Sequence, residues 1–465
     1  MNQTMTRLQK FREQEYTPFI CVLFGQGSPS PLPTNLNDPT NPLHKLEWLD
    51  QNLNDSQKDA IKFALSSREI ALIHGPPGTG KTHTLIELIL QLLKQKKRLL
   101  VCGPSNISVD NIVERLAPHK VPMIRLGHPA RLLPSVLNHS LDILTRTSEA
   151  ASLVQDIRKE MDSKQASIRK TRNGRERKQI YTELKELRKE YKERERGCVE
   201  NLVKGSKVVL ATLHGAGGFH LKGQEFDVVI VDEASQALEA QCWVPLLWVK
   251  ADKLVLAGDH LQLPPTIKSL NSKPAKATEK GKDGKSKGKK EVAGANGGDA
   301  GGEDGEGAIV KDMTLETTLF DRLLALHGPS IKRMLTTQYR MHEKIMRFPS
   351  DELYESKLIA ADFVRARLLK DLPYEVQDTE DTREPLVFWD TQGGDFPEKT
   401  EDDEIIGKGG KGGMNLGESK SNEAEAALVK MHVSNLVEAG IKAEDIAVVT
   451  PYNAQVRSFC LHSRA

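Results

Sequence analysis

The segment GPPGTGKT at residues 75–82 constrains the fold of this chain more than any other feature. It follows the apolar run Ile70–Ile73 and precedes a stretch whose apolar residues recur at helical spacing between 85 and 93. A buried strand, a glycine-rich turn and a helix, in that order, are the surroundings of a phosphate-binding loop. We therefore predict that nucleotide phosphates bind at Gly75, Pro76, Pro77, Gly78, Thr79, Gly80, Lys81 and Thr82.

The residue types within this loop suit a triphosphate and a magnesium ion. Glycine lets the backbone curl so that successive N–H groups point into one concavity, to which the helix N-terminus adds its unpaired donors. Lys81 would reach the β- and γ-phosphates, and the Thr82 hydroxyl would complete the shell of a magnesium ion. The alternative is a glycine-rich loop that only caps a helix, and the two flanking elements disfavour it.

Two adjacent acids, Asp232 and Glu233, end the apolar run at 228–231. A strand rich in valine and isoleucine belongs in a buried sheet, and carboxylates at its end must face a cation or water. In an enzyme with a phosphate-binding loop, Asp232 would hold magnesium through its water shell, and Glu233 would orient or deprotonate the attacking water. We therefore predict that Lys81, Asp232 and Glu233 are catalytic and that Thr82 and Asp232 bind the metal.

The strand predicted at 253–257 leads into the sequence GDHLQLPPT. This loop places Gln262 at the same edge of the sheet as the acids. Because an amide carries both a donor and an acceptor, Gln262 can register whether a γ-phosphate is present, and we add it to the catalytic candidates. Asp259 is equally consistent with stabilising the turn and with a catalytic role.

Further strands are predicted at 98–102 and 207–212, and the first is followed by the polar loop GPSN and a helix. Repetition of strand, polar loop and helix indicates an α/β fold with a parallel sheet. Such sheets bind ligands at the carboxyl ends of their strands, so Pro104, Ser105 and Asn106 are candidate binding residues. The alternative is that Ser105 or Asn106 only caps the helix that follows.

Length and composition limit the functions that are available. A chain of 465 residues is expected to form two or more domains. With a net charge of +2, any nucleic-acid contact must come from a local basic groove and backbone donors. The five cysteines are scattered, and no apolar stretch reaches the length of about 18 residues needed to span a membrane. We expect a soluble protein of the cytoplasm, the nucleus or both, without a membrane partner.

Two insertions interrupt the predicted domains. Residues 146–199 carry a heptad-like apolar stripe among charges and a break at Asn173, which predicts a helical hairpin. Its charges either contact a nucleic-acid backbone or form a solvated face, which we favour. Residues 271–309 are rich in lysine, glycine and acids, so we expect a disordered insertion. A helix, a strand at 446–449 and a polar loop near the end repeat the pattern of the first domain.

With GPPGTGKT, VVIVDEASQALE, GDHLQLPP, QYRMH and TPYNAQ in this order, the chain resembles superfamily 1 helicases of the up-frameshift type. Among them it is most similar to the immunoglobulin mu-switch-region-binding helicases, through NDSQK, GPSNISVDNIVERLA and DIAVVTPYN. The resemblance implies a RecA-like P-loop domain with a parallel sheet and a helical hairpin insertion, followed by an incomplete second RecA-like domain. It also implies 5′ to 3′ movement along single-stranded RNA or DNA, with ATP and Mg²⁺ as cofactors and with ribosomal or RNA-processing factors as further partners.

The domain organisation expected from these features has seven parts. They are a connecting helix remnant and linker (1–50), the first part of RecA-like domain 1 (51–145), the helical insertion (146–199), the second part of domain 1 (200–270), the disordered insertion (271–309), the end of domain 1 with a linker (310–330), and an incomplete RecA-like domain 2 (331–465).

The resemblance further implies roles for individual residues. Gln57 would contact the adenine, and Gln262 would sense the γ-phosphate. Tyr339 would stack on or near the base, and Arg340 would reach the γ-phosphate, since a planar guanidinium suits a charge-dispersed phosphoryl transition state. Backbone N–H groups and hydroxyls would grip the phosphates of the nucleic acid without reading its sequence. The residues implied for this track are Pro104, Ser105, Asn106, Thr212, Thr450, Pro451 and Tyr452.

The chain departs from the family pattern at both ends. The remaining motifs of the second domain, including a second arginine for the γ-phosphate, are not found before Ala465, and only a remnant of a connecting helix precedes the sequence FICVLFG. We therefore expect an interior piece of a longer helicase. Three functions stay open at this point: an ATP-dependent helicase, a nucleotide-binding module without turnover, and an ATPase scaffold whose hairpin binds a partner.

Overall fold

A computed structural model describes residues 2–32, 46–147, 149–170, 173–267, 314–400 and 419–462. The contacts within the chain define two units. Residues 1–75 and 80–335 form unit 1, and residues 76–79 and 336–465 form unit 2. The insertion predicted at 271–309 lies outside the described residues. Within the described ranges, no helix is both long enough and apolar enough to cross a membrane.

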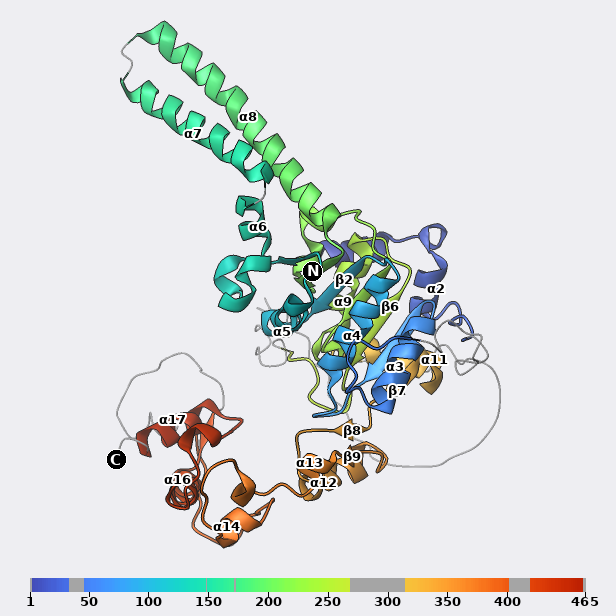
Figure 1. Cartoon of the computed structure of the whole chain (residues 1–465), viewed down its shortest axis with the longest axis vertical. Helices are drawn as coiled ribbons and strands as arrows, with labels where there is room; N and C mark the ends of the chain where they lie inside the picture. Colours follow the sequence, from blue (N-terminus) through green and yellow to red (C-terminus); the bar gives the residue numbers. More distant parts are fainter. Residues whose placement is uncertain are drawn as a thin grey trace, which may run out of the picture. The chain divides into compact units, whose positions relative to one another are not determined.

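Seven parallel strands form the central sheet of unit 1 (Figure 1). Their spatial order is β3, β4, β2, β5, β6, β1 and β7. The strands are β1 (Ile70–His74), β2 (Leu99–Gly103), β3 (Met123–Leu126), β4 (Val208–Thr212), β5 (Val228–Val231), β6 (Leu254–Gly258) and β7 (Lys332–Met334). The parallel sheet predicted from the sequence is therefore confirmed, and it extends to β7, which pairs with β1.

Alternate residues of each strand face two separate apolar cores. In β1, Ile70 and Leu72 belong to one core, which also contains residues of α2, α9 and α11. Ala71 and Ile73 belong to the other core, together with residues of α3, α4 and α5. Because both faces are covered, the strands need apolar residues at every position, which explains their continuous apolar runs. The helices of unit 1 are α1 (Asn2–Lys10), α2 (Pro18–Phe24), α3 (Asp55–Ser66), α4 (Lys81–Lys94), α5 (Asn106–Leu116), α6 (Leu141–Thr147), α7 (Glu149–Lys170), α8 (Gly174–Gly205), α9 (Glu239–Trp248) and α11 (Leu319–His327).

Side-chain caps fix where two helices beside the predicted site begin. The Asn54 side chain accepts a hydrogen bond from the Gln57 backbone N–H at 2.9 Å, and Oε1 of Gln57 accepts one from the Asn54 N–H at 3.0 Å. This reciprocal capping box starts α3 and holds the Gln57 side chain. Ser105 caps α5 by accepting a hydrogen bond from the Ser108 N–H at 3.1 Å. This is the helix cap that was one of the two alternatives predicted for that loop.

The predicted helical hairpin is confirmed as α7 and α8, which run antiparallel in the crossover between β3 and β4 (Figure 1). Asn173 caps α8 by accepting a hydrogen bond from the Arg175 N–H at 3.1 Å. Leu184 of the apolar stripe is buried, and Lys164 pairs with Glu183 across the two helices at 2.6 Å. The hairpin thus belongs to unit 1 and lies between β3, the edge strand of its sheet, and β4 along the chain.

Unit 2 contains two small sheets among its described residues, in which β8 pairs with β9 in parallel and β10 pairs with β11 in antiparallel fashion. The strand expected at 446–449 is not formed there, which corrects that prediction. A strand needs a neighbour for its backbone groups, and Val449 in this segment is 91% exposed. The elements of unit 2 are β8 (Thr337–Gln338), α12 (Glu343–Leu353), β9 (Ile359–Ala360), α13 (Asp362–Arg365), α14 (Glu380–Arg383), β10 (Lys399–Thr400), β11 (Lys420–Ser421), α16 (Glu423–Glu438) and α17 (Asn453–His462).

Candidate active site

The glycine-rich loop joins β1 to α4 and is tied to the sheet where the Gly75 N–H donates to the Gly258 carbonyl at 3.0 Å. Gly80 precedes α4 in the left-handed conformation, at φ 76°. A Cβ at Gly80 would lie 2.5 Å from Nε2 of Gln57, and one at Gly75 would lie 2.9 Å from Cβ of Lys81. Because any side chain would collide at both positions, the loop requires glycine there.

The predicted acidic pair lies at the carboxyl end of β5. Asp232 is 3% exposed, and its backbone N–H donates to the Cys102 carbonyl of β2 at 2.9 Å. The pKa of the Asp232 carboxyl group is raised to about 6, chiefly by burial; the charge of Lys81 lowers this pKa, and the charge of Glu233 raises it. An additional cation close to this buried carboxyl group would stabilise its charged form.

Glu233 adopts the left-handed backbone conformation at φ 52°, which is uncommon for a residue other than glycine. Its N–H donates to Oδ1 of Asp232 at 2.9 Å, and its Oε2 accepts from Nε2 of Gln236 at 3.1 Å. Its Oε1 accepts from Nζ of Lys81 at 2.6 Å. The structure therefore brings together Lys81, Asp232 and Glu233, which the sequence places far apart.

Gln262 is held by a buried pair at the carboxyl ends of β1 and β6. Its Nε2 donates to Oδ2 of Asp259 at 2.5 Å, and Oδ1 of Asp259 lies 2.9 Å from Nε2 of His74. The Asp259 N–H also donates to Oγ of Ser235 at 3.0 Å. Asp259 thus stabilises its turn and holds Gln262, and a catalytic role for Asp259 stays a prediction.

Unit 2 contains the remaining residues predicted for the nucleotide. The Tyr339 N–H donates to the carbonyl oxygen of Gly78 at 2.9 Å, and a Cβ at Gly78 would lie 2.7 Å from Cβ of Arg340. Buried Gln338 orders this turn, because its Oε1 accepts from the Arg340 N–H at 2.8 Å. The Tyr339 ring stacks on Phe363 with centroids 6.1 Å apart.

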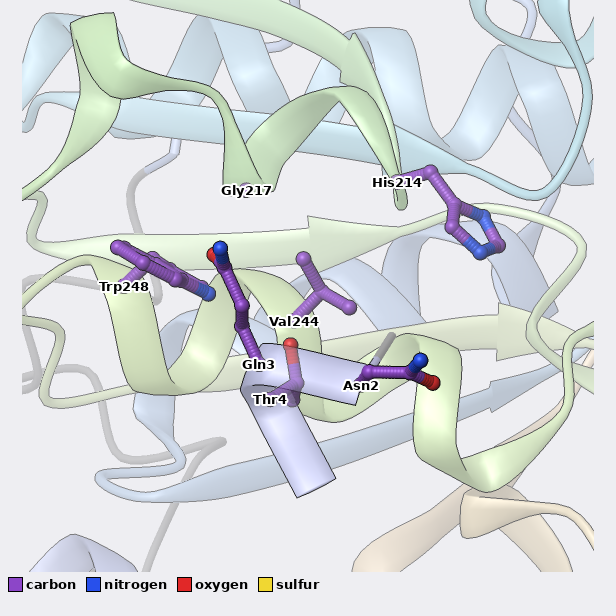
Figure 2. A pocket seen from close by; sticks show the side chains of 7 residues that line it. All are labelled: Asn2, Gln3, Thr4, His214, Gly217, Val244 and Trp248. Atoms are coloured by element: carbon purple, nitrogen blue, oxygen red, sulfur yellow. The ribbon is translucent and has the colours of Figure 1, made fainter. Parts of the chain in front are cut away.

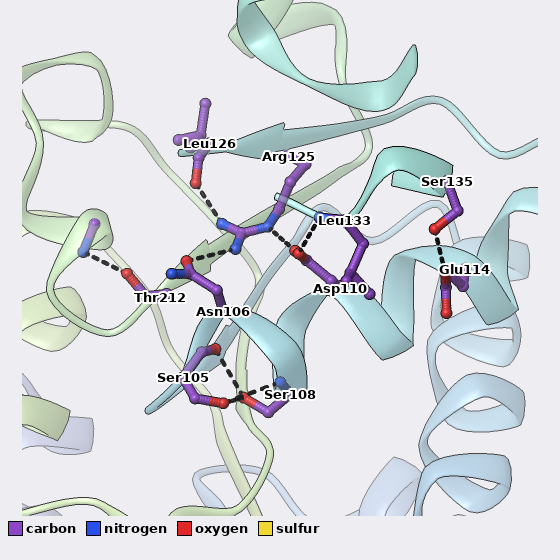
Figure 3. Close-up of polar contacts among 11 residues, drawn as sticks. Ser105, Asn106, Ser108, Asp110, Glu114, Arg125, Leu126, Leu133, Ser135 and Thr212 are labelled. Carbon is purple, nitrogen blue, oxygen red and sulfur yellow. Dashed lines mark hydrogen bonds and ion pairs between the residues drawn. The ribbon is translucent and has the colours of Figure 1, made fainter. Parts of the chain in front are cut away.

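The residues predicted for the nucleic-acid track fall into two sets. Pro104, Ser105 and Asn106 follow β2 in unit 1, and Thr212 ends β4, whose register pairs it with Gly103 (Figure 3). The structure therefore places these four residues at neighbouring strand ends. The other set precedes α17 in unit 2 and consists of Thr450, Pro451 and Tyr452.

Comparisons with known proteins connect these sites to a family. Models that are each described as an AAA domain match residues 52–270 and 315–464. The DNA polymerase alpha-associated DNA helicase A of Schizosaccharomyces pombe is 47% identical over 412 residues, which are 88% of this chain and 54% of that protein. The DNA-binding protein SMUBP-2 of Rattus norvegicus is 42% identical over 460 residues, 98% and 40% of the two chains. The regulator of nonsense transcripts 1 homolog of Neurospora crassa is 32% identical over 418 residues, 88% and 31% of the two chains.

The chain belongs to the up-frameshift-type superfamily 1 helicases. It spans between about a third and about half of the length of these three relatives. Membership of this helicase family implies the use of ATP. It also confirms the predicted fold class, because two such domains accord with RecA-like folds.

The residues around the loop fit the magnesium-bound triphosphate that this helicase family implies. Magnesium prefers oxygen ligands, which Asp232 and Thr82 offer. Asp232 is buried and its pKa is raised, so a cation at its carboxylate would be stabilising. The loop would bind the phosphates through its backbone N–H groups, because no side chain is present at Gly75 and Gly80, where one would not fit. A bound magnesium ion would neutralise charge on the transferred phosphoryl group.

Two residues of this chain near the site were not singled out in the sequence. His74 directly precedes the glycine loop, and Arg125 occupies a strand that is otherwise apolar, so a lone polar residue in a buried strand was the available signal.

A separate hollow of about 450 Å³ contains none of the predicted site residues (Figure 2). It is lined by Asn2, Gln3, Thr4, His214, Gly217, Val244 and Trp248.

Proposed function

We propose that this chain forms the ATP-hydrolysing part of a helicase that moves 5′ to 3′ along single-stranded RNA or DNA. The observation that carries the proposal is the convergence of Lys81, Asp232 and Glu233 beside the glycine loop, with Lys81 and Glu233 joined at 2.6 Å. A cation, a metal-binding acid and a water-activating acid at one sheet edge are the groups that phosphoryl transfer requires.

In this proposal, each residue acts through its ordinary chemistry. Lys81 leaves Glu233 and binds the β- and γ-phosphates, which frees the Glu233 carboxylate to accept a proton from the attacking water. Thr82 and Asp232 hold the magnesium ion. Gln262 donates one hydrogen of its amide nitrogen to Asp259, so its second hydrogen can bind the γ-phosphate and its amide oxygen can accept from the water.

Three more residues complete the proposed nucleotide site. Gln57 contacts the adenine and Tyr339 lies near the base, while Arg340 binds the γ-phosphate. A guanidinium spreads its positive charge over a plane and so stabilises the charge that develops on the transferred phosphoryl group.

The proposed nucleic-acid track consists of Pro104, Ser105, Asn106 and Thr212 in unit 1, and of 450–452 in unit 2. Hydroxyl and amide groups at these positions bind phosphates and sugars and carry no sequence preference. The names of two relatives specify DNA, whereas a third is named for nonsense transcripts. RNA and DNA are therefore both candidate substrates, and the experiment uses each of them.

The decisive experiment measures phosphate release from ATP by the purified chain with and without single-stranded RNA or DNA. We expect release that is stimulated by single strands and lost in Lys81→Ala, because this substitution removes the cation that binds the phosphates. Equal release by both proteins would refute hydrolysis at this loop. ATP binding that raises thermal stability while release stays at background would instead identify a nucleotide-binding module without turnover.

A further inference from the structure

Arg125 of β3 is a fully buried arginine, with 0% of its side chain exposed. Its Nε donates to Oδ1 of Asp110 on α5 at 2.7 Å, and its Nη2 donates to Oδ1 of Asn106 at 3.0 Å (Figure 3). A third donor, Nη1, binds the carbonyl of Leu126. The second carboxylate oxygen of Asp110 accepts from the Leu133 N–H at 3.1 Å. The guanidinium of Arg125 in β3 therefore binds two residues of α5, namely Asp110 and Asn106, which is the first residue of that helix.

The chemistry of this contact fixes which way the Asn106 amide faces. A guanidinium has donors and no acceptor, so only the amide oxygen of Asn106 can face it. The Asn106 NH₂ group must then point away from Arg125. Asn106 is partly exposed and lies between the exposed residues Ser105 and Ile107, so its amide presents donors beside the surface.

Removing both charges of a buried ion pair from water costs free energy, which can exceed the attraction between them. Apolar residues of similar volume are often equally stabilising or better at such positions, and buried pairs are best understood where they specify one geometry. Here the specified geometry is the orientation of Asn106. The pair of Arg125 and Asp110 is electrically balanced, so it orients the amide without adding net charge under the track.

We propose that Arg125 is a positioning residue for nucleic-acid binding, which aims the NH₂ group of Asn106 at a backbone phosphate of the single strand. The inference rests on the proposed function, since it assumes that this surface binds nucleic acid. Asn106 makes the contact, and Arg125 acts through it. A phosphate oxygen is an acceptor only, so it can be bound by an amide NH₂ group and not by an amide oxygen.

The test replaces the donor and keeps the contact with Arg125. In Asn106→Asp, a carboxylate oxygen still accepts from Arg125, and an acid in the first turn of a helix is stabilising, so the thermal midpoint should be unchanged or higher. Affinity for a labelled single-stranded oligonucleotide, measured by fluorescence anisotropy, should fall about tenfold or more, as for one lost hydrogen bond to a charged group. The matched control is Asn111→Asp, which adds the same charge at an exposed position of α5 and should bind nearly as well as the unaltered chain.

A second variant tests Arg125 itself. The double substitution Arg125→Met with Asp110→Leu replaces the buried pair by apolar side chains of similar size, an exchange that is often neutral or stabilising for a buried ion pair. It leaves the Asn106 amide without its partner, so single-strand affinity should fall several-fold while the thermal midpoint is retained. If this double variant unfolds, Arg125→Lys takes its place, because the lysine keeps a positive charge opposite Asp110 but lacks the planar fork that also reaches Asn106. Full affinity in this variant would count against positioning in the same way.

Three results would overturn the inference. Equal affinity of Asn106→Asp and Asn111→Asp would show that the amide does not contact phosphate. Loss of affinity in Asn106→Asp, together with full affinity in a folded double variant, would show that Arg125 is not needed for positioning. Failure of the unaltered chain to bind any single strand would remove the proposed function and this inference with it, and is distinguishable from the first two results.

Discussion

Glu233→Gln should tighten binding of magnesium-ATP while it removes turnover. Lys81 donates to Glu233 at 2.6 Å, and the two side chains are 12% and 30% exposed. In the proposed function, ATP breaks this pair when its phosphates bind Lys81. A hydrogen bond to a charged group contributes about 1.5–3 kcal/mol, and one to a neutral group about 0.5–1.5 kcal/mol. The midpoints of these ranges differ by about 1.2 kcal/mol, so replacing the carboxylate by an amide should lower the cost of freeing Lys81 by that amount, or about eightfold in affinity.

Isothermal titration calorimetry with magnesium-ATP gives the affinity, and a phosphate-release assay gives the turnover. Loss of the group that accepts the proton from water should lower turnover by about 10²- to 10⁴-fold. The matched control is Glu239→Gln, which makes the same change in the pair with Arg322, at 2.8 Å. That variant should bind ATP as the unaltered chain does. Unchanged or weaker binding in Glu233→Gln would refute the idea that this acid competes with phosphate for Lys81.

Two further predictions concern the buried residues behind the loop. In Asp259→Asn the carboxylate that holds Gln262 is lost, so turnover should fall by about tenfold while the KM for ATP stays nearly constant; an equal rise in KM would indicate that Asp259 serves ATP binding instead. Burial first, and then the charges of His74 and Lys332, lower the pKa of His260 to about 4, although Asp259 and Asp321 oppose this. Because the unfolded chain binds this proton near pH 6.5 and the folded chain near pH 4, stability should fall as pH drops through that window. His260→Phe, which keeps the stacking on Phe320, should flatten this part of the profile in thermal melts, and parallel profiles would contradict the assignment.

The sequence was sufficient for the elements whose signals are local. The order of strand, loop and helix around 75–82 predicted β1 and α4, and the break at Asn173 predicted the turn of the hairpin. The partners of polar residues were not predictable, because they depend on which strands become neighbours. Arg125 and Asp110 form an ion pair because β3 lies beside β4 at the end of the sheet. The local sequence around either residue does not indicate that the other is its partner.

Segments that need a distant partner were also hard to predict. The run at 446–449 has the composition of a strand, yet composition alone supplies no neighbour for its backbone groups, and the segment is not a strand in unit 2. His74 shows the same limit at the site. Its own segment does not indicate a polar partner, whereas its contact with Asp259 connects it to Gln262.

The hairpin of α7 and α8 has a mechanical consequence. With 32 residues, α8 is about 48 Å long at a rise of about 1.5 Å per residue. A helix of that length is a lever, so a tilt of about 5° where it leaves the sheet would carry its far end through about 4 Å. Small adjustments of β4 would thus become large displacements at the tip, where a bound molecule could sense them.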